Sequence, residues 1–191
     1  LPIVPAQRAA SEITDAVVDI IIVDKKSCGE CGIESDGCQV GFAIIGPTAG
    51  SPGLPSEVIY TQDGWATAGE TFIGSLSTSE EPNAAAGVGT YLVVVSNDSG
   101  SLHYAPIADI LNGVETWTEV TTGFSGSGDP NGIFSLGRTR TWIAGDGGYI
   151  YFSDDITAGV TVQTAGDVTV EDLTAIHGLN KDNLVAVGAN N

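Results

Sequence analysis

One pattern recurs three times in this chain. The copies span residues 60–72, 104–117 and 151–162. Each begins with a tyrosine at the end of a short apolar run, passes through polar or acidic residues to a glycine, and closes on a threonine beside an aromatic or β-branched residue. The tyrosines, Tyr60, Tyr104 and Tyr151, lie 44 and then 47 residues apart. A repeat of this length, made of short strands, is typical of β-propeller blades.

The sequence around these copies divides into units of four short strands. It contains 26 glycines and no methionine, and Val, Ile and Thr are common, as in chains of many strands and tight turns. We therefore expect an all-β protein with about three and a half four-stranded antiparallel blades, and a β-sandwich is the alternative. The predicted parts are an extended arm at 1–12 and a partial propeller at 13–191, with blades at approximately 13–76, 83–122, 131–165 and 171–191.

The fourth predicted unit is incomplete. It holds two strands, 173–177 and 183–187, and stops at the turn that precedes a third. Unpaired strand edges pair with whatever is available. We expect, in this order, that the natural polypeptide continues past Asn191, that another chain completes the sheet, or that an open arc packs against a larger assembly. The arm and the incomplete unit are the expected sites of subunit contact by strand addition.

Charge narrows the classes of partner. The chain has 24 acidic residues against 6 lysines and arginines, giving a net charge of −18. This balance excludes a phosphate backbone or an anionic membrane surface as the natural partner. It favours either solubility through self-repulsion or the recruitment of Ca²⁺ or a basic partner. No apolar run reaches the roughly 18 residues that span a bilayer, so membrane insertion is not expected.

Residues within the repeats carry a family resemblance. Asp63-Gly64 and Ser153-Asp154 fit early positions of the box Ser-x-Asp-x-Gly-x-Thr-Trp, and Thr116-Trp117 fits its end. Over residues 39–191 the chain resembles proteins with sialidase-type Asp-box (BNR) repeats and the related photosystem II stability/assembly factor-like propellers. In such a box the aspartate accepts backbone N–H bonds in a turn and the aromatic packs between sheets. The resemblance thus implies structural roles for Asp63, Gly64, Trp117, Ser153 and Asp154.

Three cysteines, Cys28, Cys31 and Cys38, fall within eleven residues. The first hypothesis is a disulfide that closes the long hairpin, with Cys38 as one partner. A Zn²⁺ site with Asp36 or Glu34 as fourth ligand, and free thiols, are the alternatives. The combination of this cluster with propeller repeats is similar to repeat-bearing structural proteins of tailed viruses, which implies a virion role.

Catalytic constellations are incomplete in this sequence. Sialidase chemistry requires an arginine cluster, but Arg138 and Arg140 share one strand and Arg8 lies in the arm. The two arginines are therefore expected to pair with acids. His103 and His177 have no nucleophile elbow near them. No catalytic residue is predicted.

Cofactor sites are equally incomplete. Oxygen ligands that could hold Ca²⁺ cluster in turns, but no complete ligand loop is present. The glycine-rich turn at 145–148 lacks the lysine and helix of a phosphate loop. We expect no cofactor, with Zn²⁺ or Ca²⁺ as the alternatives. The calcium candidates are Asp146, Asp154, Asp155 and the turn around Asn97 and Asp98.

The function expected from these observations is that of a non-catalytic structural or interaction module. It would present a rigid acidic β surface to other subunits of a virion assembly, tail or capsid-associated, or of an extracellular one. The alternative is a glycan-binding or carbohydrate-active propeller used in host or surface attachment, with Trp65, Trp117 and Trp142 as stacking platforms. A third hypothesis is a chaperone-like assembly factor.

Overall fold

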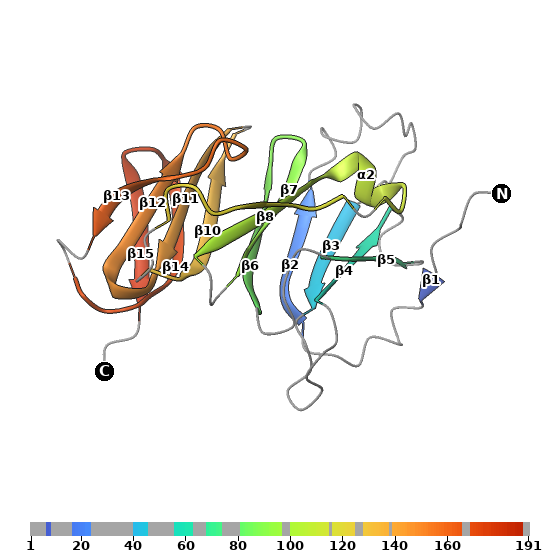
Figure 1. The fold of residues 1–191 in the computed structure, drawn as a ribbon, viewed down its shortest axis with the longest axis horizontal. Helices are drawn as coiled ribbons and strands as arrows, with labels where there is room; N and C mark the ends of the chain where they lie inside the picture. Colours follow the sequence, from blue (N-terminus) through green and yellow to red (C-terminus); the bar gives the residue numbers. More distant parts are fainter. Residues whose placement is uncertain are drawn as a thin grey trace.

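The computed structural model describes residues 7–8, 17–23, 40–45, 56–62, 68–73, 81–96, 100–114, 116–124, 128–137, 139–165 and 169–188. These residues form mainly β strands, grouped in four antiparallel sheets that follow one another along the chain (Figure 1). Apart from the short strand at residues 7–8, consecutive strands are neighbours within each sheet, so each sheet is an up-and-down meander. The predicted fold class, a partial propeller of four-stranded antiparallel blades, is confirmed.

We number the sheets as blades 1 to 4. Blade 1 contains β2 (Val17–Val23), β3 (Val40–Ile45), β4 (Glu57–Thr61) and β5 (Ala68–Phe72). In blade 2 the strands are β6 (Pro82–Val88), β7 (Tyr91–Ser96), β8 (Ser101–Pro106) and β9 (Thr118–Val120). Blade 3 contains β10 (Pro130–Leu136), β11 (Arg140–Gly145), β12 (Tyr149–Ser153) and β13 (Thr161–Ala165). The described part of blade 4 consists of β14 (Leu173–Asn180) and β15 (Asn183–Gly188).

Two elements were not predicted from the sequence. Strand β1 (Gln7–Arg8), within the predicted arm, pairs with the outer edge of β5, so blade 1 has five strands. A short helix, α2 (Ile107–Leu111), follows the third strand of blade 2. Its Ile107 and Ile110 are buried against the apolar layer between blades 1 and 2, because residues three apart share one helix face.

Tight turns and β-branched runs explain the strands locally. Strand β7 reads Tyr-Leu-Val-Val-Val-Ser, and side chains of this kind pack well on a pleated surface. The hairpin from β6 to β7 has a two-residue loop, and its Gly89 has φ 62°, a conformation that glycine adopts without strain.

The first strands of the blades lie next to one another. Strand β6 packs against β2 and β10, and β10 packs against β14. Figure 1 shows these four strands side by side across the middle of the molecule. They therefore occupy the position of the innermost strands of a propeller, and the later strands of each blade lie farther out.

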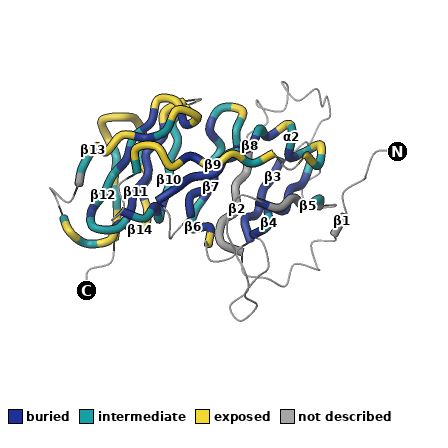
Figure 2. The backbone as a smooth tube through the Cα atoms, in the orientation of Figure 1, coloured by how far each residue is buried: buried dark blue, intermediate teal, exposed yellow. Residues whose placement is uncertain are grey.

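The apolar core is divided into layers between blades. Alternate residues of one strand face opposite neighbours, so Leu92 and Val94 of β7 pack toward blade 1, whereas Val93 and Val95 pack toward blade 3. A third layer, which includes Trp142 and Ile176, joins blades 3 and 4. In Figure 2, β3, β4 and β7 are buried, whereas exposed positions gather over the C-terminal blades.

Candidate functional site: the axis end and the open edge of blade 4

Every first strand begins with the same irregularity. The strand register shifts between Val17 and Asp19, Pro82 and Ala84, Pro130 and Gly132, and Leu173 and Ala175. Each shift leaves one extra residue, as in a β-bulge, and a bulge re-aims the side chain of that residue. In blades 2 and 3 the extra residue is an asparagine, Asn83 and Asn131.

Both asparagines bridge to the following blade. The Asn83 Nδ2 donates to the Pro130 carbonyl at 2.9 Å and to the Asn131 Oδ1 at 3.1 Å. The Asn131 Nδ2 donates to the Leu173 carbonyl at 3.1 Å and to the Asp146 Oδ1. The bonds thus run without a gap from blade 2 to blade 4 and fix this end of the propeller axis.

A short repeated motif in the sequence corresponds to these bridges, but the pattern of apolar strands did not identify it. Glu81-Pro82-Asn83-Ala84 and Asp129-Pro130-Asn131-Gly132 repeat an acid, a proline and an asparagine at a spacing of 48 residues. The two motifs lie at the start of equivalent strands, which only the observed register makes clear.

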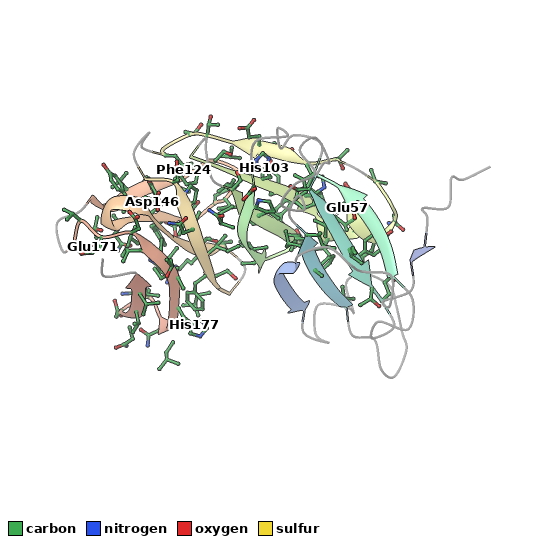
Figure 3. The ribbon with its side chains drawn as sticks, turned by 90° about the horizontal axis from the view of Figure 1, so that it is seen from below. Glu57, His103, Phe124, Asp146, Glu171 and His177 are labelled. Carbon is green, nitrogen blue, oxygen red and sulfur yellow. The ribbon has the colours of Figure 1, made fainter. Side chains whose placement is uncertain are left out.

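The same end of the axis carries acids. Glu81, Asp129 and Asp172 directly precede the first strands of blades 2, 3 and 4. The Asp172 Oδ1 accepts the backbone N–H of Gly147 at 3.0 Å, which ties blade 4 to the turn after β11. Figure 3 labels Asp146 and Glu171, which directly precede the two bonded residues Gly147 and Asp172. We call these five residues, Glu81, Asp129, Asp146, Glu171 and Asp172, the acidic rim.

Two of the residues predicted as possible Ca²⁺ ligands, Asp146 and Asp155, accept hydrogen bonds within the protein. Asp146 accepts the Asn131 amide, and Asp155 accepts from Thr157. In the part of the chain that the structure describes, no group of three or more His, Cys, Asp or Glu side chains is arranged to hold a metal ion. The turn around Asn97 and Asp98 lies outside the described residues.

The turn after β12 corrects the role predicted for Asp154. Ser153 acts as a turn residue, since its hydroxyl donates to the Gly159 carbonyl at 2.7 Å and accepts the Asp155 N–H at 3.1 Å. The carboxylate that accepts the turn N–H is that of Asp155, bonded to Thr157 N at 3.0 Å. Asp154 is instead exposed and lies 3.8 Å from the Arg140 guanidinium. The expected pairing of Arg140 with an acid is therefore observed, whereas Arg138 lies outside the described residues.

The tryptophans differ from the predicted stacking platforms. Trp142 is 2% exposed and packs against Phe152 and Phe134 inside the layer between blades 3 and 4, so this prediction is wrong for Trp142. Trp117 is half-buried and packs against the layer between blades 1 and 2, in the core position that the resemblance implied. Trp65, Asp63 and Gly64 lie outside the described residues, as do Cys28, Cys31 and Cys38.

The two histidines of the chain lie in different surroundings. The His103 Nε2 lies 3.3 Å from the Ser101 hydroxyl, and both residues are fully buried in blade 2. His177 is exposed on β14 and its ring contacts that of Phe134. Burial raises the pKa of the Tyr60 phenol above its ordinary value of 10.0, which is the opposite of what a tyrosine nucleophile needs.

The described part of blade 4 ends at β15. Among the described strands, β15 pairs only with β14. Its Leu184 and Ala186 pack toward blade 3, whereas Val185 and Val187 point to the other face and are 65% and 54% exposed. Leu179, in the adjoining part of β14, is 84% exposed.

Comparison with known proteins identifies a fold and leaves the family open. No known family model matches this sequence, and no curated protein does. A solved structure described as "YCF48 bound to D1 peptide" is similar with a TM-score of 0.56 and 14% sequence identity, covering 98% of this chain and 65% of that chain. YCF48 is a photosystem II assembly factor with a β-propeller fold, so the likeness supports a β-propeller-like fold here. This chain thus spans less than two thirds of the length of that chain.

One further finding concerns membranes. Within the described residues, no helix combines the length and the hydrophobicity needed to cross a bilayer.

Proposed function

We propose that this chain is a non-catalytic module that binds other polypeptides of a larger assembly through a rigid, acidic β surface. Charge is the observation that carries the proposal. In residues 139–188 both described bases are held by acids of the same chain, Arg140 by Asp154 and Lys181 by Asp182. The acidic rim adds further carboxylates at the adjoining end of the axis, so the surface favours basic partners.

The similar structure supports a polypeptide as the partner. YCF48 was solved bound to a peptide, and its chain has the fold that this chain has in part. The fold alone does not determine function, so we infer the class of peptide that binds from the charge of this chain. By the resemblance to repeat-bearing structural proteins of tailed viruses, we place the assembly in a virion or outside the cell. The Asp-box relationship is part of the same proposal, and it is supported by the turn at Ser153.

Selection from a display library tests the proposal. The chain is immobilised and offered unstructured peptides grouped by net charge, at low and at physiological salt. We expect enrichment of basic peptides, with binding that weakens as salt rises. A glycan array serves as the comparison. Absence of any enriched peptide, or saturable binding to glycans only, would refute the proposal.

A further inference from the structure

We propose that Asn131-Gly132 is a modification site at which the asparagine deamidates when blade 4 separates from blade 3, and that the product prevents the native bridge from forming again. The reaction needs no partner, so this inference goes beyond the proposed function. Two packing requirements meet at this pair of residues. The bridge to blade 4 requires an amide at position 131, and the approach of β10 to β14 requires glycine at position 132.

The contacts between β10 and β14 show both requirements. The Asn131 Nδ2 donates to the carbonyl of Leu173, the first residue of β14, at 3.1 Å. A Cβ atom on Gly132 would lie 2.8 Å from the Ala175 Cα in the same strand, so a larger residue would push β14 away. The fold therefore places an asparagine directly before a glycine in β10.

Deamidation of an asparagine that precedes glycine is an intramolecular acyl transfer. The Gly132 nitrogen attacks the side-chain carbonyl carbon of Asn131, a succinimide ring closes, and Nδ2 leaves as ammonia with the proton of the Gly132 N–H. Water then opens the ring: cleavage of the new C–N bond leaves aspartate, and cleavage of the original peptide bond leaves isoaspartate. In sum, one amide and one water give one carboxylate and one ammonium ion. Glycine favours the attack, because it has no side chain to hinder its nitrogen and its backbone reaches conformations that other residues avoid.

The reaction competes with the native hydrogen bonds of the Asn131 amide. Its Nδ2 donates to Leu173 and Asp146, and its Oδ1 accepts the Asn83 amide at 3.1 Å. Nδ2 must give up both donated bonds before it leaves as ammonia, and one of these bonds ends on blade 4. The rate therefore depends on how often β14 withdraws from β10, which is a local opening. The loss of two or three bonds should slow the reaction by roughly tenfold or more relative to the urea-unfolded chain.

The product cannot rebuild the bridge. A carboxylate at position 131 accepts hydrogen bonds but donates none, and its two former partners, the Asp146 carboxylate and the Leu173 carbonyl, are acceptors as well. Two carboxylates at hydrogen-bond distance also repel one another. The isoaspartate form in addition lengthens the main chain of β10 by one carbon. Blade 4 therefore stays loosened after the opening that allowed the reaction.

Ageing of the natural chain in mildly alkaline buffer, followed by peptide mapping with mass spectrometry, measures conversion at each asparagine. Asn131 should convert faster than Asn83, which forms the equivalent bridge but precedes Ala84. Ile176→Ala loosens the layer between blades 3 and 4 and should speed conversion at Asn131 by about tenfold or more. Ile44→Ala, the same change in the layer between blades 1 and 2, should leave that rate unchanged. Equal conversion at Asn83 and Asn131, equal acceleration by both variants, or an intact Asn131 in Ile176→Ala would overturn the inference.

Asn131→Asp reproduces the aspartate product and tests its effect on blade 4. Hydrogen exchange of the β14 amides should be faster in this variant than in Asn131→Ala, because only the aspartate adds a charge beside Asp146, and the excess should shrink as salt rises. Asp146→Asn combined with Asn131→Asp supplies a donor to the new carboxylate and should slow the exchange again. The aged natural chain gives the same measurement without a substitution. Exchange no faster than in Asn131→Ala, or no recovery in the double variant, would overturn the inference.

Discussion

Asn83 and Asn131 show how single side chains can set the spacing of whole blades. Each occupies the extra position of a bulge and uses its amide to donate to a carbonyl of the next blade. A half-buried amide that lost such an acceptor would have to find water, which is costly at a packed end. These residues therefore fix the positions of blades 2, 3 and 4 relative to one another. The apolar layers also hold the blades together, but apolar contacts have no preferred direction.

Asn131→Ala should lower the free energy of unfolding by about 1–3 kcal/mol, because it removes the two hydrogen bonds that the Asn131 amide donates and the one that its Oδ1 accepts from Asn83. Urea denaturation followed by circular dichroism measures the change. Asn112→Ala is the matched control, since the Asn112 amide also donates to a carbonyl, at 2.8 Å, but within one exposed turn. An equal loss in both variants would contradict a role in joining the blades.

Turn residues illustrate what can be predicted at this scale. The repeat located the turn after β12 and identified Ser153 correctly, because hydroxyl and carboxylate residues before a glycine favour turns. It could not decide between Asp154 and Asp155, which are adjacent and chemically identical. The choice depends on which carboxylate faces Thr157 and which faces Arg140, and that depends on the local backbone.

The strands were the most predictable elements of the molecule. Runs of Val, Ile and aromatic residues bounded by glycine and asparagine located every four-stranded unit, because strands buried on both faces have a strong apolar signal. Helix α2 was missed because five residues are too few to show a 3.6-residue period. Strand β1 was missed because two residues have no pattern, and only the pairing with β5 defines it.

Strands β10 and β14, the first strands of blades 3 and 4, approach each other closely, and this leads to a further prediction. A Cβ atom added to Gly132 would lie 2.8 Å from the Ala175 Cα and 3.0 Å from the Thr174 carbonyl oxygen of β14. Alanine is normally favoured over glycine inside a strand by roughly 0.5–1 kcal/mol. Here we expect the opposite sign, a loss of about 1–3 kcal/mol, because β10 and β14 must move apart. Thermal unfolding of Gly132→Ala measures it, and a rise in stability would show that the strands can separate freely.

At the scale of the whole molecule, the blades form a series in which each contacts its neighbours. The layer between blades 1 and 2, the layer between blades 2 and 3, and the layer between blades 3 and 4 share no buried residue. Arrays of this kind are stabilised by terms within each unit and terms between nearest neighbours. The period of the repeat predicted this arrangement, whereas the side chains that face each neighbouring blade are identified only by the observed burial.

Deletion of residues 169–191 tests the nearest-neighbour arrangement. It removes Leu173 and Ile176 from the layer around Trp142, so the emission of Trp142, assigned with Trp142→Phe, should shift to the red. Hydrogen exchange should become faster in β11, while β3 and β4, two blades away, keep their protection. Equal loss of protection in all these strands would mean that the blades unfold as one unit.

The same deletion also tests the two single-residue substitutions, because it removes their neighbours in blade 4. Without blade 4, Asn131 loses its Leu173 acceptor and the Cβ of Gly132→Ala meets no neighbour in β14. Both substitutions should therefore cost less in the shortened chain than in the full one, and Gly132→Ala should become neutral or stabilising. The difference between the two backgrounds is the coupling energy of each residue with blade 4. If both costs were unchanged, these residues would act within blade 3 alone, and the bridge along the axis would not hold the blades together.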